Sequence, residues 1–331
     1  MEDREHFRTK KWLGVDIGGT KTAVCLGDSS GNITQKVRFP TQKNPEPALE
    51  QIVTEAKKLM SKEQTPPSGI GISVPSPVDQ SKGKILTPPN LKGWRNFPIV
   101  AEMKRFLDFP VHLENDANGG ALAQWFFGNK PHIFGNKPHK RILIYLTMST
   151  GMGGGIVLDG HLLRGENDSA GEFGHLVLDR HGPRCACGQR GCFEALCGGR
   201  SILQRVQKQI EEGRFATTLS NSQEINMQSI AAAYRAGDPF AHEVWSTFVD
   251  HLAQGIGALI MCFNPTDVVL GTIAVLEAKS LFPLLQGKLP QYAWKAPRQA
   301  CSIYPSTLGL LSGELGALAI ALYGESRKKS F

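Results

Sequence analysis

Trp12-Leu-Gly-Val-Asp-Ile-Gly-Gly-Thr-Lys-Thr-Ala-Val-Cys-Leu26 joins two apolar segments through a short glycine loop. Residues 12–17 and 22–26 have the composition of buried strands, and Gly18 and Gly19 permit a tight turn between them. The stretch therefore predicts a β-hairpin. It excludes both a P-loop and a dinucleotide-binding loop, because in those loops the glycines open a helix.

A second stretch repeats this pattern in the other half of the chain. An apolar run at 142–146 leads into the loop Ser149-Thr-Gly-Met-Gly-Gly-Gly155, and a further apolar run follows at 156–158. The repetition predicts two related lobes. Predicted strands and helices alternate, which indicates an α/β class. The further strands are expected at 33–39, 69–74, 111–113 and 267–270, and the helices near 49–60, 117–127, 230–236, 241–262 and 313–322.

Both hairpins carry groups that suit a phosphate chain. Glycines let backbone N–H groups approach an anion, so each loop could form an anion cradle. Asp16 ends the first strand, where it could hold a metal-bound water, while threonine hydroxyls and Lys21 could donate to phosphate oxygens. The alternative is that the two loops are only tight hairpins. The candidate phosphate-binding residues are Asp16, Gly18, Gly19, Thr20, Lys21, Thr150, Gly151 and Gly153.

Four potential metal ligands follow the second hairpin closely: His175, Cys185, Cys187 and Cys192. The C-x-C and C-x₄-C spacings let three thiolates point at one centre, and a Cys₃His set is a familiar tetrahedral zinc complement. Because all four ligands belong to the protein, the expected Zn²⁺ site is closed and structural. The alternative is a group of free buried thiols. The remaining cysteines are expected in the core: Cys25, Cys197, Cys262 and Cys301.

Composition sets the broad class of protein. A length of 331 residues predicts two domains, and an odd total of seven cysteines argues against a disulfide framework. The net charge of +7 is scattered, with small basic clusters at the ends and around residues 137–141, so a solvated surface is favoured over nucleic-acid binding. No signal peptide and no apolar run of roughly 18–20 residues is recognised, which predicts a cytoplasmic protein. The hexapeptide at 127–132 recurs at 134–139 and is interpreted as a duplication that lengthens a surface loop.

Five motifs, taken in order, carry a resemblance to a known family. The chain resembles the ROK family (repressors, open reading frames and sugar kinases), and it is most similar to the glucokinase-type members. The resemblance covers nearly the whole chain. The motifs are Asp16-Ile-Gly-Gly-Thr-Lys21, Glu114-Asn-Asp-Ala-Asn118, Ser149-Thr-Gly-Met-Gly-Gly-Gly155, Gly171-Glu-Phe-Gly-His175 and Cys185-Ala-Cys-Gly-Gln-Arg-Gly-Cys-Phe-Glu194.

The resemblance implies a two-lobed α/β fold of the sugar kinase and actin type, which is ribonuclease H-like, with sugar and ATP in a central cleft. A smaller lobe is expected at 1–117, completed by a C-terminal helix at about 311–331, and a larger lobe with the zinc loop at 118–310. Asp116 matches the family's catalytic base, and His175 would place one ring nitrogen on zinc and turn the other to the sugar. The implied sugar-binding residues are Asn115, Asp116, Glu172, His175 and Glu194, and Gly271 is implied near the nucleotide.

The implied activity is ATP-dependent phosphorylation of a hexose at its 6-hydroxyl, with D-glucose as the leading substrate and Mg²⁺ accompanying ATP. The expected partners are ATP and a hexose, in a dimer or tetramer, without nucleic acid or membrane. Other acceptors remain open, namely N-acetylglucosamine, N-acetylmannosamine, fructose or another hexose, and polyphosphate remains open as donor. Three positions depart from the family pattern: Ser76, Ser149 and Thr272.

A sugar-responsive transcriptional regulator is the alternative from another class, since the family includes such proteins. They carry a helix-turn-helix ahead of the sugar-kinase-like body. Here eleven residues precede Trp12, which is too few for that module, so an enzyme is expected.

Overall fold

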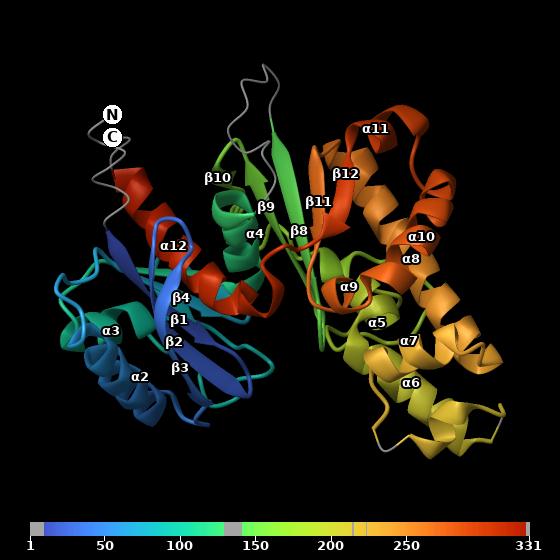
Figure 1. Cartoon of the computed structure of the whole chain (residues 1–331), viewed down its shortest axis with the longest axis horizontal. Coiled ribbons are helices and arrows are strands. Elements are labelled where there is room, and N and C mark those ends of the chain that lie inside the picture. Colours follow the sequence, from blue (N-terminus) through green and yellow to red (C-terminus); the bar gives the residue numbers. More distant parts are fainter. Residues whose placement is uncertain (1–9, 129–140, 214, 223, 329–331) are drawn as a thin grey trace. The chain divides into compact units, whose positions relative to one another are not determined.

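The computed structural model describes residues 10–128, 141–213, 215–222 and 224–328. The chain forms two compact units (Figure 1). Unit 1 comprises Met1–Lys137, Leu162–Ala170 and Leu310–Phe331, and unit 2 comprises Pro138–His161 and Gly171–Gly309. The duplicated hexapeptide and the basic clusters at 137–140 and at both ends fall largely outside the described residues.

The sheet of unit 1 has the order β3-β2-β1-β4-β7. Its first three strands form an antiparallel meander, while β4 and β7 run parallel to β1. The hairpin predicted first is therefore present, with β1 and β2 joined by three residues. The strands are β1 (Lys11–Ile17), β2 (Lys21–Asp28), β3 (Ile33–Pro40), β4 (Ile70–Val74) and β7 (Val111–Asn115), and a small separate hairpin is formed by β5 (Val78–Asp79) and β6 (Lys84–Ile85).

Helices cover both faces of this sheet because side chains alternate along each strand. Leu13 and Val15 of β1 share an apolar core with Ile52 of α2. On the other face, Gly14 and Gly71 leave room for α12, whose backbone a side chain at Gly71 would overlap. The helices of this unit are α2 (Pro45–Met60), α3 (Ile99–Phe106), α4 (Asp116–Phe127) and α12 (Ser312–Lys328).

Helix α4 belongs with unit 1, and the expected division between the lobes after residue 117 falls inside it, after its second residue. It crosses α12 closely at two glycines: a β-carbon added to Gly316 would lie 3.1 Å from Gly119. The segment 162–170 also returns to this unit, where the backbone N–H of Gln80 donates to Asp168 at 3.0 Å. The first unit is thus assembled from three separate stretches of chain.

The sheet of unit 2 repeats the topology of unit 1, with the order β10-β9-β8-β11-β12. An antiparallel hairpin again leads, and β11 and β12 again run parallel to its first strand. The internal repeat inferred from the two glycine stretches is confirmed at this level. The strands are β8 (Ile142–Met148), β9 (Met152–Leu158), β10 (His161–Leu162), β11 (Asp267–Leu270) and β12 (Ser302–Pro305).

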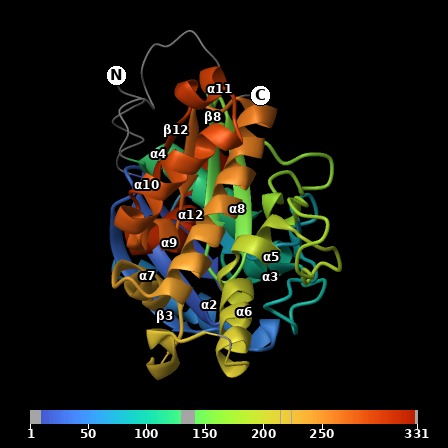
Figure 2. The same cartoon turned by 90° about the vertical axis from the view of Figure 1, so that its right-hand side faces the viewer.

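Helix α8 (Pro239–Phe263) is the centre of the core of unit 2. It begins at the N-cap Asp238 and ends at Asn264, which adopts a left-handed conformation. Figure 2 shows it lengthwise, with α5 and α10 on either side. The remaining helices are α5 (Phe193–Cys197), α6 (Gly199–Glu211), α7 (Met227–Arg235), α9 (Ile273–Leu276), α10 (Ala278–Lys288) and α11 (Lys295–Ala300). Short 3₁₀ turns are η2 (Phe173–His175), η3 (Thr218–Asn221), η4 (Leu289–Gln291) and, where the chain passes from unit 2 to unit 1, η5 (Gly309–Leu311).

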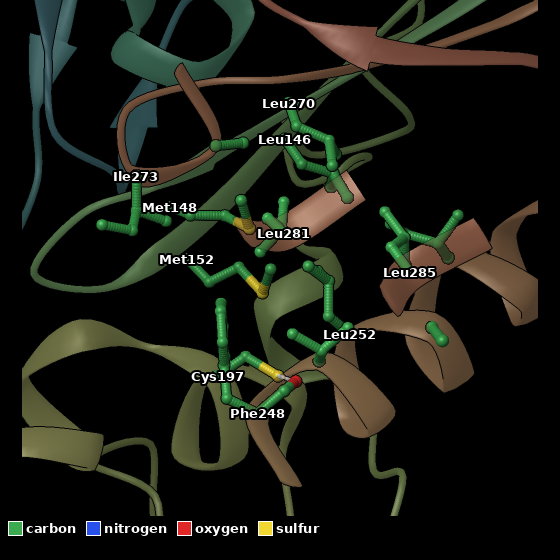
Figure 3. Packing of buried hydrophobic residues seen from close by; sticks show 14 of the residues in the cluster. Leu146, Met148, Met152, Cys197, Phe248, Leu252, Leu270, Ile273, Leu281 and Leu285 are labelled. Atoms are coloured by element: carbon green, nitrogen blue, oxygen red, sulfur yellow. Dashed lines mark hydrogen bonds between the residues drawn. The ribbon is translucent and has the colours of Figure 1, made fainter. Parts of the chain in front are cut away.

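The apolar interior of unit 2 joins the strands to these helices. Leu146 and Leu270 come from the sheet, and Leu252 and Leu285 from α8 and α10 (Figure 3). The Cys197 thiol donates to the Phe248 carbonyl oxygen at 3.7 Å within this core. These contacts tie the sheet and α5 to α8.

Two expectations need correction. Cys25 and Cys197 are buried as expected, but Cys262 is exposed, because it lies near the end of α8 where the helix leaves the core.

In addition, α8 is long and apolar enough to cross a membrane by length and composition, although no such run was expected. Half of its most apolar window is buried inside the structure, which is equally typical of a core helix.

Candidate functional site

The carboxyl ends of the three parallel strands of unit 1 gather polar side chains. Asp16 is paired in register with Ser73, and Ser73 in turn with Glu114. Asn115 ends the third strand and Asp116 begins the helix that follows. In α/β sheets this edge is where ligands bind. Sequence reasoning identified Asp16, Asn115 and Asp116, and the parallel register now places them along one edge.

Asp16 has an unusual environment for an aspartate. Burial raises its pKa from 3.8 to about 7, and the negative charges of Asp116 and Glu314 act in the same direction. The Ser73 hydroxyl, which donates a hydrogen bond to it, and the charge of Arg38 oppose the increase. The carboxylate is therefore poised to ionise fully when a cation approaches.

An ion pair that the sequence did not reveal lies beside Asp16. Glu314, in the first turn of α12, is buried and accepts hydrogen bonds from Arg38 of β3, with Nε at 2.7 Å. A side chain on Gly313 would overlap the Asp16 carboxylate, so glycine is needed where α12 meets β1. No local spacing could have indicated the pair, since its members are 276 residues apart.

The first hairpin loop is fixed from the side of β3. The backbone N–H of Thr41 donates to the Thr20 carbonyl at 3.0 Å, and its hydroxyl donates to the Gly18 carbonyl at 2.8 Å. The Thr41 hydroxyl also lies 2.8 Å from the Thr22 hydroxyl of β2. Thr20 and Lys21 are exposed at the loop. The loop is thus rigid in its backbone and open in its side chains, as a phosphate cradle requires.

Asn115 and Asp116 form the N-terminus of α4. The Asn115 side-chain oxygen accepts the backbone N–H of Asn118 at 2.7 Å and caps the helix, so the amide NH₂ is the part of Asn115 suited to a ligand. Asp116 is exposed at the first helical position, where the helix dipole favours a carboxylate. A carboxylate held there could accept a proton from a hydroxyl.

Glu114 connects this strand edge to Arg164 and to helix α4. It is buried and pairs with Arg164, whose Nε donates at 2.6 Å, and it also accepts from the Asn118 amide at 3.2 Å. Burial raises the pKa of Glu114, and the charge of Arg164 opposes the increase. The Arg164 guanidinium also lies 5.5 Å from the centre of the Tyr323 ring. Sequence reasoning missed this network.

The second hairpin loop in unit 2 is shorter than expected. Strand β9 begins at Met152, so Gly153 pairs with Thr147 inside the ladder, and the expectation of a loop reaching residue 155 is wrong. The turn itself spans 149–151. It is bonded to the start of α6, where the N–H groups of Gly199 and Arg200 donate to the carbonyls of Ser149 and Thr150, both at 3.0 Å.

Glu194 links this loop to the cysteine-rich segment. Its carboxylate accepts the Met152 backbone N–H at 2.9 Å, and a side chain on Gly151 would overlap it. Glu172 and His175 frame η2, in which the His175 N–H donates to the Glu172 carbonyl at 3.1 Å. Both side chains are half-buried. Three of the predicted sugar-binding residues therefore lie in unit 2, and the other two, Asn115 and Asp116, in unit 1.

A pocket of about 450 Å³ opens beside the second loop, entirely within unit 2. Its volume is in the range of small-molecule sites. Thr150 and Thr272 lie at the pocket, and Gly271 precedes it, packed so closely on Tyr145 that a side chain would overlap the ring hydroxyl. The pocket is lined by apolar side chains together with amides and one arginine: Met148, Leu203, Met227, Ile273, Leu276, Gln204, Gln207, Gln228 and Arg200.

The four predicted metal ligands come together. The ligand atoms of His175, Cys185, Cys187 and Cys192 all lie within 4.8 Å of one another. The Cys187 and Cys192 sulfurs are 3.6 Å apart, and the Cys185 sulfur is 3.8 Å from His175 Nδ1. Ligand bonds of about 2.3 Å for sulfur and 2.0–2.1 Å for nitrogen in a tetrahedron give separations of about 3.8 and 3.6 Å. The donor set and its spacing therefore fit zinc.

The segment that carries these ligands is fixed by tight turns. Gly191 has a positive φ of 64°, and a side chain there would overlap the Asp179 backbone. The Leu178 carbonyl accepts the Gln254 side chain of α8 at 3.1 Å. Since Nδ1 of His175 faces the cysteines, Nε2 is the ring nitrogen left for another partner.

The repeated sheets and the polar strand ends are those of an actin-like ATPase fold of the sugar kinase type. The chain belongs to the ROK family: the sequence profile described as "ROK family" matches residues 12–323. The glucokinase of Thermotoga maritima is 31% identical over 94% of this chain and 96% of its own length.

Solved structures agree with this assignment. A ROK hexokinase from Thermus thermophilus has a TM-score of 0.80 and 32% identity, covering 96% of this chain and 99% of its own. A ROK family glucokinase from Streptomyces griseus, in complex with glucose and AMPPNP, has a TM-score of 0.76 and 27% identity over 94% of this chain and 99% of its own. Proteins named xylose repressor also match, at 25–28% identity, and the chain covers 76–77% of their length.

Proposed function

We propose that this protein phosphorylates a hexose at its primary 6-hydroxyl with ATP, converting D-glucose to glucose 6-phosphate. The observation that carries the proposal is the shared strand edge of unit 1, where Asp116 is exposed at a helix N-terminus and Asp16 lies near the end of β1, two strands away. The relatives named glucokinase, and the glucokinase solved with glucose and AMPPNP, support the same substrates.

Asp116 is the proposed catalytic base. Its carboxylate accepts the proton of the 6-hydroxyl as that oxygen attacks the γ-phosphorus, a role typically worth about 10²–10⁴-fold in rate. The Asn115 amide and the side chains of Glu172, His175 and Glu194 bind and orient the other sugar hydroxyls. Phosphoryl transfer needs mainly such positioning and stabilisation of charge.

The two glycine loops hold the phosphates, and the pocket of unit 2 receives the adenosine. Thr20, Lys21 and Thr150 donate to phosphate oxygens, and the apolar and amide side chains around Thr272 suit a purine and its ribose. Mg²⁺ bound with ATP neutralises phosphate charge, and Asp16 is the residue of this chain that would hold its water. The three residues of each turn are glycine, serine or threonine, so backbone amides and short side chains would lie beside the phosphates together with Lys21.

A bound zinc ion would fix the conformation of the cysteine-rich segment and the orientation of the His175 ring. With Nδ1 on zinc, the proton of the neutral ring would lie on Nε2, and this N–H would be the group that donates to a sugar hydroxyl. The same segment leads into α5 and so positions Glu194. The proposed zinc is structural, because protein groups occupy all four positions.

The test is the substitution Asp116→Asn, with Asp108→Asn, an exposed aspartate of the same unit, as the matched control. We expect Asp116→Asn to reduce kcat by about 10²–10⁴-fold while glucose still binds in a calorimetric titration, because the amide cannot accept the proton. Asp108→Asn should leave both unchanged. Turnover of Asp116→Asn at the wild-type rate would reject the assignment.

Substrate choice is tested with a panel of glucose, fructose, mannose, N-acetylglucosamine and N-acetylmannosamine, each with ATP, GTP or polyphosphate. We expect the highest kcat/KM for glucose with ATP. The xylose repressors among the relatives motivate a regulator as the second candidate. Sugar binding without phosphorylation of any panel member would favour that candidate over the kinase.

A further inference from the structure

We propose that unit 2 contains an accessory site for a small zwitterion, a carboxylate and an amine on a short apolar body, of the kind an aliphatic amino acid presents. The site is a pocket of about 270 Å³ formed by the cysteine-rich segment, α6 and α8. It shares no lining residue with the larger pocket assigned to adenosine. None of the residues given a role in phosphoryl transfer lines it.

The inner wall of the pocket is apolar. Leu196 and Phe240 line it, together with Ile202 and Val206 of α6 and Phe248 of α8. All five side chains are otherwise buried in the core of the unit. Such a surface favours an aliphatic group over water, and the volume accommodates a branched chain of a few carbons.

Two nitrogen-bearing side chains suit a carboxylate. Arg205 directs Nη1 to the Ala195 carbonyl at 2.5 Å and Nη2 to the Leu196 carbonyl at 2.9 Å, which uses two of its five N–H donors. Among the described residues no carboxylate lies within ion-pairing distance of Arg205. His251 also lines the pocket, and its buried Nδ1 has no hydrogen-bond partner within the described part of the chain.

Two acidic side chains line the same pocket and suit an ammonium group. Glu243 is exposed on α8, and Asp179 belongs to the cysteine-rich segment, where one of its oxygens accepts the His181 backbone N–H at 2.9 Å. A simple anion would meet these two negative charges, and a simple cation would meet Arg205. A ligand that carries both charges on an apolar body satisfies all three parts of the lining.

The test measures binding directly, so its outcome is independent of kinase activity. L-leucine is titrated calorimetrically into the full-length protein, beside 4-methylpentanoate, which lacks the amine, and 3-methylbutylamine, which lacks the carboxylate. For nine non-hydrogen atoms we expect a dissociation constant of about 1 mM for L-leucine. Each single-charge analogue should bind at least about threefold more weakly.

Three variants locate the site. Glu243→Gln should weaken L-leucine about threefold but should bind 4-methylpentanoate at least as tightly as the wild type, because a repulsive charge is removed; Glu211→Gln, an exposed glutamate of α6 outside the pocket, should change neither. Thr247→Trp, at the exposed rim, should block all binding without removing a core contact. The proposal is overturned if L-leucine shows no saturable binding up to about 10 mM, if 4-methylpentanoate binds as tightly as L-leucine, or if Thr247→Trp binds as the wild type does.

Discussion

The two glycine hairpins share a topology but differ in what surrounds them. In the hairpin of unit 1, Asp16 lies near the end of the first strand, beside Ser73 and the Arg38–Glu314 pair, so the surroundings of the turn are ionic. The hairpin of unit 2 is bonded to the first backbone amides of α6 and opens onto a largely apolar pocket. In the proposed function, one structural unit used twice would supply a charged edge for phosphate and cation in one copy and an apolar surface for the base in the other.

The largest expected effect is on kcat/KM for MgATP, and it should differ between substitutions in the two hairpins. Asp16→Asn should lower kcat/KM for MgATP by about 10²–10³-fold, because it removes the carboxylate proposed to hold the Mg²⁺-bound water. Thr150→Ala should cost only about 2–13-fold, the usual value of one hydrogen bond. Steady-state kinetics at saturating glucose measure both. If Thr150→Ala costs as much as Asp16→Asn, the proposed division between the hairpins is wrong.

The next effect is the loss of a structural zinc ion, which is expected in unit 2. The wild type should contain about one zinc per chain, and Cys187→Ser should lose it, with a lower melting temperature and a higher KM for glucose, since metal binding is coupled to folding. Cys262→Ser changes an exposed cysteine outside the cluster and serves as control. Elemental analysis that finds no zinc in the wild type would contradict the assignment.

A smaller effect follows from the raised pKa of Asp16. Nucleotide binding that needs the ionised carboxylate should weaken as pH falls below about 7. Arg38→Gln removes a charge that lowers this pKa, so the acid limb of kcat/KM for MgATP should move to higher pH by up to about one unit; Glu314→Gln should move it to lower pH. Limbs that move in the same direction in both variants would contradict this account.

The same raised pKa of Asp16 gives the free energy of unfolding a pH dependence opposite in sign to that of nucleotide binding. Between 3.8 and about 7 the folded protein holds a proton that the unfolded chain has released. The contribution of Asp16 to the free energy of unfolding therefore decreases as pH rises through that interval. Asp16→Asn should flatten this part of the pH dependence of denaturant unfolding, measured without nucleotide.

The smallest effects come from adding one methyl group to each turn. A β-carbon at Gly19 would lie 2.9 Å from the Asn90 β-carbon and 3.1 Å from its carbonyl oxygen, so backbone must move and Gly19→Ala should cost about 1 kcal/mol of stability. At Gly151 it would meet only the Glu194 carboxylate, which can rotate away. Gly151→Ala should therefore spare stability and raise the glucose KM a few-fold. Equal melting temperatures for the two variants would contradict the distinction.

Local pattern was sufficient to predict much of this molecule. The alternation of apolar runs and glycines gave both hairpins, and the cysteine spacing gave a cluster whose geometry fits zinc. Tertiary contacts determine the remainder. The pairs Glu114–Arg164 and Arg38–Glu314 join distant parts of the chain, and Gly153 proved to be a strand residue because ladder pairing with β8 overrides its loop-like composition. The helix at 199–211 was not predicted, since two glycines open it.

The place of α12 has a consequence for how the chain folds during synthesis. This helix fills the grooves over Gly14 and Gly71, and its Glu325 accepts the Trp12 indole N–H at 3.0 Å. Until residues 312–328 leave the ribosome, β1 and β4 lack the helix that packs on one of their faces. Unit 2 is already complete by then. Although domains usually mature from the N-terminus onward, here the second unit can fold first, and the nascent first sheet is a natural client for a chaperone.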